Sequence, residues 1–312
     1  MTECRDFFYP SADGRMQIHA RCWQPEGAPR AVVQIAHGVS EHILRYEPFA
    51  RYLTEQGFAV VGNDHLGHGE SAIEGKGRLY FGPKGSWNTV VQDLEVLRQR
   101  TREQFPAVPY FLLGHSMGSF LARTYLIRHH GTVNGAIIMG TGQMPPALTK
   151  SGILAAKAES LRVGEDNPSG LINKIAFAPY NKPFAPHRTP FDWLSINEKN
   201  VDDYIAHPFC GGIPSCGLFR EMLTGVSFIT DQRNVEQMDR ATPILFISGA
   251  MDPVGDLGKG VKRAYGSFRA AGMKDVSIKL YPQLRHEILN EDCRQEVYED
   301  LLTWMNSKFP AK

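Results

Sequence analysis

The chain alternates short, nearly uninterrupted apolar runs with longer stretches that have the periodicity of amphipathic helices. The apolar runs are strand-sized and occupy residues 30–36, 58–62, 110–113, 135–139, 243–248 and 276–281. Helical patterns follow at residues 46–56, 86–104, 116–130, 258–271 and 292–308. Continuous apolar strands suit a parallel sheet that helices cover on both faces. We therefore predict an α/β fold with a mostly parallel sheet and helices on both of its faces.

The beginning of the chain adds two more strands to this pattern. Residues 7–9 and 16–23 alternate apolar and polar side chains and are joined by the turn Ala12-Asp13-Gly14. This arrangement predicts an antiparallel hairpin that opens the sheet, which brings the expected number of strands to eight. A chain of 312 residues buries enough surface to fold without a disulfide or a structural metal.

Residues 144–232 break the alternation of strands and helices. They make up 89 of the 312 residues but contain nine of the twenty prolines. Proline at this density interrupts regular elements and favours short helices joined by turns. The segment is also rich in aromatic side chains, so it is not a disordered linker. We expect a core of residues 1–143 and 233–312, with residues 144–232 inserted as a helical cap.

The composition argues against several kinds of partner and site. The 34 basic and 33 acidic side chains give a formal net charge of +1, which offers nucleic acid no electrostatic attraction. Five cysteines without a C-x-x-C pair argue against a disulfide framework or a thiolate zinc site and predict buried free thiols. The first residues lack the apolar core of a signal peptide, and no run approaches the ~18 apolar residues of a membrane span. We therefore expect a cytoplasmic protein.

The sharpest motif is Gly114-His115-Ser116-Met117-Gly118, a G-x-S-x-G sequence. It directly follows the apolar run 110–113 and opens the helical pattern 116–130. This strand–turn–helix context is the one in which the motif presents a nucleophilic serine. The glycines leave room for a sharp turn, and the turn exposes the hydroxyl at the N-terminus of the helix. We predict that Ser116 is a nucleophile.

A serine hydroxyl needs a base to take its proton, and the base needs a carboxylate to orient it. In a sheet of this kind the expected order along the chain is serine, acid, histidine. Asp252 and His286 each follow a late apolar run, which places both at the carboxyl ends of strands, where α/β sites are built. Asp256 is the competing acid, but it lies nearer the next helical pattern. We therefore predict a triad of Ser116, Asp252 and His286.

Acyl transfer also needs N–H groups that stabilise a developing oxyanion. The backbone amide after the nucleophile, that of Met117, is expected to be one donor. The second should come from the loop after the run 30–36, which reads His37-Gly38-Val39-Ser40-Glu41-His42. Val39 is the natural candidate, because His37 and Gly38 form the turn.

Motifs spread over nearly the whole chain resemble the monoacylglycerol lipase and lysophospholipase family of α/β-hydrolases, which is serine aminopeptidase S33-like, in its bacterial form. They are HGVSEHILRY, NDHLGHGES, GHSMG, GAMDPVG and YPQLRHEILNE, with FDWLS and VDDYIAHPFC inside residues 144–232. The resemblance implies the α/β-hydrolase fold and the same triad and oxyanion donors. One difference is Ser119, which stands where members commonly have a further glycine.

The same resemblance implies a pocket for the alcohol part of a substrate. Glu41 and Arg45 resemble polar residues that line this pocket, and Tyr204 resembles a tyrosine of the cap that faces it. The implied activity is a serine ester hydrolase that cleaves fatty-acyl esters of glycerol, or lysophospholipids, through an acyl-enzyme. A small lipid ester is the expected partner, together with transient contact between the cap and a membrane surface. No cofactor and no metal are expected, since the run DHLGHG at residues 64–69 lacks the ligand order of binuclear metallohydrolases.

Two alternatives stay open. A proline-type aminopeptidase shares the triad and the cap, and it needs acidic cap residues that bind a free amine. Candidates for that role are Glu159, Glu165, Asp166, Glu198, Asp202, Asp203 and Glu221. A non-catalytic binding module on the same fold is the alternative outside the enzymes, and the presence of every predicted triad and oxyanion residue disfavours it.

Overall fold

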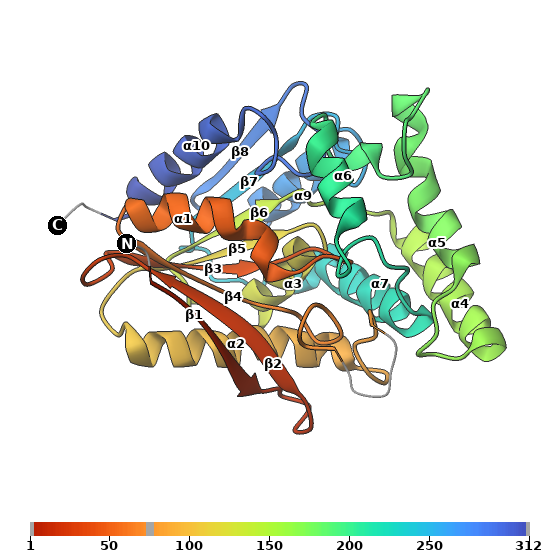
Figure 1. Cartoon of the computed structure of the whole chain (residues 1–312), viewed down its shortest axis with the longest axis horizontal. Coiled ribbons are helices and arrows are strands. Elements are labelled where there is room, and N and C mark those ends of the chain that lie inside the picture. The colour runs from red at the N-terminus through yellow and green to blue at the C-terminus, as the bar shows by residue number, and fades with distance from the viewer. Residues whose placement is uncertain (1–2, 73–77, 310–312) are drawn as a thin grey trace.

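Eight strands form a single twisted sheet at the centre of the molecule (Figure 1). The computed structural model describes residues 3–72 and 78–309. The strand order is β1-β2-β4-β3-β5-β6-β7-β8, with the bounds β1 Glu3–Pro10, β2 Gln17–Gln24, β3 Ala31–Ala36, β4 Phe58–Asn63, β5 Tyr110–His115, β6 Gly135–Met139, β7 Ile244–Gly249 and β8 Val276–Tyr281. β2 pairs antiparallel with β1 and β4, and all other neighbours pair in parallel. The predicted hairpin and the mostly parallel sheet are confirmed.

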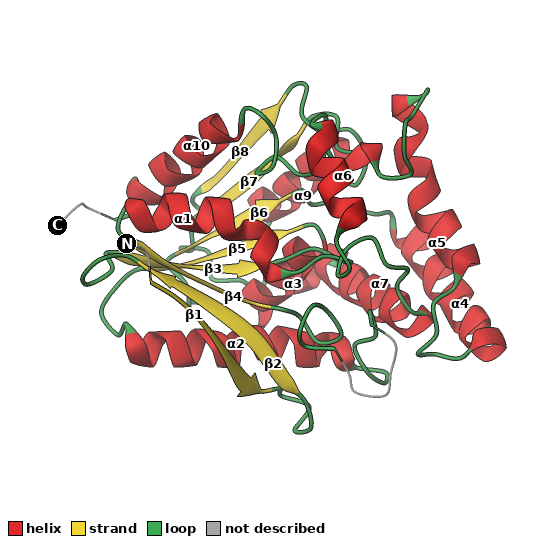
Figure 2. Cartoon of the chain, viewed as in Figure 1, coloured by secondary structure: helices red, strands yellow, loops and turns green. Residues whose placement is uncertain are grey.

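Helices cover both faces of the sheet (Figure 2). On one face lie α1 (Glu47–Glu55), which follows the short 3-10 helix η1 (Ile43–Tyr46), and α10 (Arg294–Asn306). On the other lie α2 (Ser86–Gln104), α3 (Met117–Arg128) and α9 (Lys259–Ala270). Alternate strand residues face the two layers: Phe111 and Leu113 pack with α1 and α10, whereas Tyr110 and Leu112 pack with α2 and α3. Because both faces are covered, the central strands are apolar without alternation.

The segment between β6 and β7 is entirely helical in its regular elements. Its bounds are α4 Pro146–Val163, α5 Gly170–Phe177, η2 Ala178–Phe184, η3 Asp192–Leu194, α6 Glu198–Ala206, α7 Cys216–Thr230 and α8 Gln232–Val235. α4, α5 and α6 lie beyond the carboxyl ends of the parallel strands, with α4 and α5 farthest out (Figure 1). α7 packs against α3 and places Leu218, Val226 and Ile229 in the main core.

The prediction of short helices throughout this segment was wrong for two of them. α4 has 18 residues and α7 has 15. The prolines lie at or before the start of these helices, where a missing N–H costs nothing because the first N–H groups of a helix have no partner within it. Pro145 and Pro146 begin α4, and Pro214 precedes α7. The other helices of the segment are short, and the regular elements of residues 178–195, with Pro183 inside η2, are 3-10 helices only.

All five cysteines are free thiols. The prediction that they are buried holds only for Cys22 and Cys216, whereas Cys4 and Cys210 are half-buried and Cys293 is exposed beside the start of α10. In the part of the chain that the structure describes, no helix combines the length and the hydrophobicity that a membrane crossing requires.

Candidate active site

Ser116 lies on a sharp turn between β5 and α3. Its backbone has φ 55° and ψ −121°, a left-handed conformation that is strained for a residue with a side chain. The turn depends on both glycines of the motif. A Cβ atom on Gly118 would lie 1.9 Å from the carbonyl oxygen of Ala36, and one on Gly114 would lie 2.3 Å from the oxygen of Gly118. The motif therefore forms the predicted strand–turn–helix geometry, with Ser116 at the N-cap position of α3.

Asp252 and His286 are joined by a hydrogen bond of 2.9 Å between His286 Nδ1 and Asp252 Oδ2. Both side chains are buried, and Asp252 also accepts hydrogen bonds from Ser248 Oγ (3.1 Å) and the Val254 amide (2.9 Å). A proton on Nδ1 leaves Nε2 of His286 free to act as a base. The competing acid, Asp256, is exposed and pairs with Arg263 instead. The structure thus brings together the predicted acid and base, and Ser116 and His286 line the same cavity.

The two predicted oxyanion donors border the same cavity. Met117 is the first residue of α3, and the first N–H groups of a helix have no acceptor within it. Val39 lies in the loop after β3. Ser40, the next residue, has φ 56°, and its carbonyl accepts hydrogen bonds of 3.0 Å from the Tyr204 hydroxyl and from the Gly211 amide. The inserted segment therefore holds the loop that carries Val39.

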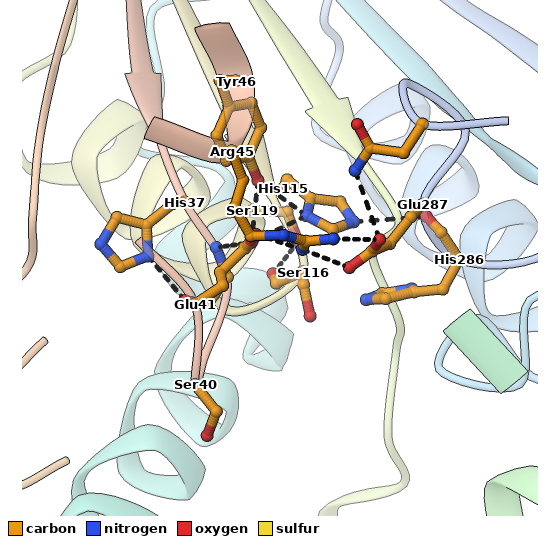
Figure 3. Close-up of polar contacts among 12 residues, drawn as sticks. His37, Ser40, Glu41, Arg45, Tyr46, His115, Ser116, Ser119, His286 and Glu287 are labelled. Carbon is orange, nitrogen blue, oxygen red and sulfur yellow. Dashed lines mark hydrogen bonds and ion pairs between the residues drawn. The ribbon is translucent and has the colours of Figure 1, made fainter. Parts of the chain in front are cut away.

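A buried network of charges lies beside Ser116 (Figure 3). Glu41 accepts hydrogen bonds from the Gly38 amide (2.5 Å) and the Tyr46 hydroxyl (2.8 Å), and its carboxylate is 3.2 Å from His115 Nδ1. Arg45 donates to Glu41 Oε2 (3.0 Å) and makes two hydrogen bonds with Glu287, of 2.5 and 2.7 Å. These contacts satisfy every charged group in the network, as buried charges require.

The network shifts the pKa values of its members. Burial alone would raise the pKa of Glu41, but the hydrogen bond with His115 and the charge of Arg45 outweigh it and hold this pKa well below its usual range. Burial alone would lower the pKa of His115, but the hydrogen bond with Glu41 and its negative charge raise it. His115 Nε2 also lies 3.3 Å from the carbonyl oxygen of His286. His115 therefore connects the charge network to the backbone that carries the predicted base.

The three residues expected on the alcohol side have different positions. Glu41 and Tyr204 line the cavity, whereas Arg45 lies behind them, with its guanidinium 4.9 Å from the centre of the Tyr204 ring. Sequence reasoning missed Glu287, which is buried, lines the cavity and pairs with Arg45. The available signal was its position directly after His286. Sequence reasoning also missed His115, which occupies the first unspecified position of the G-x-S-x-G motif.

The cavity has a volume of about 680 Å³ and extends from Ser116 and His286 into the inserted segment. Its far walls come from α4, α5 and α7 and from the aromatic residues before α6. Most of the side chains there are apolar, and they include Leu148, Ile172, Phe177, Trp193, Phe219 and Leu223. The ring of Trp193 lies against His286, with 5.1 Å between the ring centres. Ser116, the predicted nucleophile, thus borders a largely apolar chamber of the size that binds small molecules.

Comparisons with known proteins agree with this geometry. A family model described as serine aminopeptidase, S33, matches residues 27–293. Human monoglyceride lipase is 26% identical over 304 residues, which cover 96% of this chain and 89% of the human protein. Monoacylglycerol lipase of Mycolicibacterium smegmatis is 28% identical over 304 residues, which cover 94% of each chain. The structure of a thermostable carboxyl esterase from Bacillus coagulans in complex with glycerol has a TM-score of 0.90 and 30% identity, and the match covers 98% of this chain and 99% of the esterase. The chain therefore belongs to the serine aminopeptidase S33 family of α/β-hydrolases, in its monoacylglycerol lipase and lysophospholipase branch, and is a carboxylic ester hydrolase.

Proposed function

We propose that the protein cleaves medium- and long-chain fatty-acyl esters of glycerol through an acyl-enzyme on Ser116. The Ser116 hydroxyl attacks the ester carbonyl while Nε2 of His286 takes its proton. Asp252 holds the His286 ring and stabilises its positive charge. The Val39 and Met117 amides stabilise the oxyanion of the tetrahedral intermediate. His286 then gives its proton to the departing glycerol oxygen.

The second half of the proposed reaction repeats the first with water. His286 takes a proton from water, and the resulting nucleophile attacks the acyl-enzyme carbonyl. The tetrahedral intermediate collapses, its bond to Ser116 Oγ breaks, and the proton returns from His286 to this oxygen. The fatty acid leaves and the enzyme is regenerated, without any cofactor.

The apolar chamber beside Ser116 is the observation that carries this proposal. Each methylene group that leaves water for an apolar wall gains about 0.8 kcal/mol. A fatty chain laid along residues such as Ile172, Phe177 and Phe219, which line the cavity, would gain several kcal/mol in this way. The share of this gain that raises the rate depends on contacts made in the transition state. A preference for longer acyl chains is the consequence.

The lining of the cavity also has a polar part that suits a small alcohol. Glu41, Tyr204 and Glu287 belong to it, and Arg45 holds the two carboxylates in place. We propose that Glu41 and Tyr204 face the glycerol group and that Arg45 positions them. The names of the human and mycobacterial relatives and the glycerol in the Bacillus coagulans esterase structure support the same substrate class.

The aminopeptidase alternative needs a carboxylate that is free to bind an amine. Among the described residues that line the cavity, the only carboxylates are Glu41 and Glu287, and both pair with Arg45. None of the seven acidic residues considered in the inserted segment lines it. Glu159, for example, pairs with Arg162, and Glu221 accepts hydrogen bonds from the Gly85 and Trp87 amides. These observations favour the ester over the peptide amine.

A substrate panel tests the proposal. We expect kcat/KM to rise from acetyl to medium- and long-chain monoacylglycerols, and to be lower for lysophospholipids of the same chain length and for prolyl amides. A flat profile over acyl chain length would contradict the role of the apolar chamber. Faster turnover of prolyl amides than of any lipid ester would favour the peptidase.

We further propose that residues 144–232 act as a cap that touches the lipid surface. Large apolar side chains that do not line the cavity are exposed on its outer helices α4 and α5: Leu154, Leu161 and Leu171. Exposed apolar side chains of this kind gain free energy at the boundary between lipid headgroups and acyl chains. The fatty ester would then enter the cavity from the surface that the cap touches.

A further inference from the structure

Three side chains that the proposed reaction does not use gather beside the candidate active site. His42 ends the loop after β3, and His207 and Cys210 follow α6 in the inserted segment. One donor atom from each of these residues lies within 4.8 Å of the donor atoms of the other two. We propose that His42, His207 and Cys210 bind one zinc ion.

His42 contributes a buried nitrogen that lacks a partner. The side chain is 4% exposed, and within the described chain its Nε2 has no hydrogen-bond partner. Leaving a buried polar atom unsatisfied costs about 1–3 kcal/mol, so the site has a polar group that a bound ion would satisfy. A neutral imidazole nitrogen of this kind is a common metal ligand.

Cys210 contributes the sulfur. Its amide donates a hydrogen bond of 3.0 Å to the carbonyl of His207, so both side chains project from one turn. Zinc binds cysteine as a thiolate, so the Cys210 thiol loses its proton when the ion binds. The nearby positive charge of Arg45 is already balanced by Glu41 and Glu287. It therefore opposes a bound cation only weakly.

The donor set of two imidazoles and one thiolate suits zinc better than magnesium or calcium, which prefer oxygen ligands. In a tetrahedral site with Zn–N near 2.0–2.1 Å and Zn–S near 2.3 Å, donor atoms are about 3.5 Å apart, so the three side chains must close by roughly 1 Å. The rings of His42 and His207 are stacked, 4.2 Å apart, and the half-buried His207 ring must turn to aim at a shared ion. An ion on its Nδ1 would replace a 3.2 Å hydrogen bond from the Phe209 amide.

An ion bound at this cluster would join the core to the inserted segment. His42 and His207 are 165 residues apart in the sequence (207 − 42) and belong to the core and the inserted segment. The same two parts are already joined by the hydrogen bonds of Ser40 with Gly211 and Gly212. A zinc ion would add a stronger connection on the loop that carries Val39. It would thereby fix the loop on the inserted segment.

Spectroscopy and binding with the whole chain test the proposal. Cobalt(II), which can replace zinc in such sites, should give a thiolate-to-cobalt absorption band with wild-type protein, and Cys210→Ser should abolish it. Competition with a chromogenic chelator should show one zinc ion per chain. The affinity should fall at least about tenfold in Cys210→Ser and in His207→Phe, since loss of even a residue that supports a ligand costs 10–100-fold. His207→Phe keeps an aromatic ring against His42.

Exposed residues of the same type provide matched controls. Cys293→Ser and His187→Ala should keep both the band and the affinity, and all variants should melt normally in the absence of metal. If one ligand variant fails to fold, the other and the wild-type cobalt spectrum decide. Absence of the thiolate band, or equal zinc affinity in wild type and both ligand variants, would overturn the proposal. A loss of affinity in Cys293→Ser or His187→Ala as large as in the ligand variants would also overturn it.

Discussion

Arg45 and Glu287 lie 242 residues apart in the sequence and form a two-pronged ion pair, with Nη1–Oε1 and Nη2–Oε2 distances of 2.5 and 2.7 Å. Arg45 also bonds to Glu41, which in turn contacts the Gly38 amide and His115. Glu287 directly follows His286 in the sequence. The ion pair therefore fixes the loop after β3 and the loop after β8 against each other. These two loops carry the predicted oxyanion donor Val39 and the predicted base.

This ion pair predicts a large effect of Glu287→Gln on stability. Removing one partner of a buried ion pair leaves the other charge poorly compensated, which typically costs 3–5 kcal/mol. Because Glu41 still pairs with Arg45, we expect a loss near the lower end, about 3 kcal/mol, in the free energy of unfolding measured with urea. The exposed control Glu236→Gln should stay within about 0.5 kcal/mol of wild type. Equal stability of the two variants would contradict the structural role of Glu287.

The two nearby carboxylates should respond very differently to substitution. Asp252→Asn should lower kcat roughly 10³–10⁴-fold, because His286 loses the acceptor that fixes its tautomer and stabilises its cation. Asp256→Asn should leave kcat near the wild-type value, since Asp256 is exposed and paired with Arg263. Steady-state kinetics on a p-nitrophenyl ester measure both. The reverse order of effects would mean that Asp256 is the orienting acid.

Asp93 predicts how stability changes with pH. Burial raises the pKa of this carboxyl to about 7, although hydrogen bonds from the Ala12 amide and the Ser11 hydroxyl act to lower it. The folded protein therefore binds more protons than the unfolded chain between about pH 4 and pH 7, and the free energy of unfolding should fall as pH rises through this window. Asp93→Asn should remove this part of the slope and stabilise the protein by a few kcal/mol near pH 8. Unfolding curves that keep the same slope in Asp93→Asn would contradict the assignment.

The exposed leucines of α4 predict a difference between dispersed and membrane-bound substrates. Leu161 is 92% exposed and Leu154 is 65% exposed. Replacing both by Asp should lower the rate on monoacylglycerol in phospholipid vesicles several-fold, because burying a charge at the lipid boundary is costly. The rate on a water-soluble short-chain ester should not change. The control Phe8→Asp, at an exposed apolar position on the edge strand β1, should change neither rate. If Phe8→Asp lowered the rate on vesicles as much as the double leucine variant does, the proposed contact between the cap and the lipid surface would be contradicted.

The sequence predicted the fold well because its apolar runs are nearly continuous and its helices are strongly patterned. α2 begins and ends at the predicted residues, 86 and 104. The helix lengths in segment 144–232 were harder to predict, because a proline can stand at the start of a helix as well as at a point where a helix breaks. Pro145 and Pro146 start α4, which then runs 18 residues. A proline count over the whole segment could not separate these cases.

The sequence predicted those residues of the site that belong to a motif or that follow the carboxyl end of a strand. The bond between Asp252 and His286 joins two residues that the order of strands already placed at one edge of the sheet. The network of Glu41, Arg45 and Glu287 was not predictable as a unit, because it depends on the directions of side chains from two distant loops. The cluster of His42, His207 and Cys210 has no ligand spacing that a sequence pattern could reveal. Its side chains come from the core and from the inserted segment, so only the fold brings them together.

The proposal that Ser116 forms an acyl-enzyme is tested most directly by covalent labelling of wild type and Ser116→Ala. A fluorophosphonate probe should modify wild-type protein once, at Ser116, as mass spectrometry of the labelled peptide would show. Ser116→Ala should fold normally, take up no label, and lose at least about 10³-fold in kcat on monoacylglycerol. Labelling or turnover that persists in Ser116→Ala would place the nucleophile elsewhere and contradict the account.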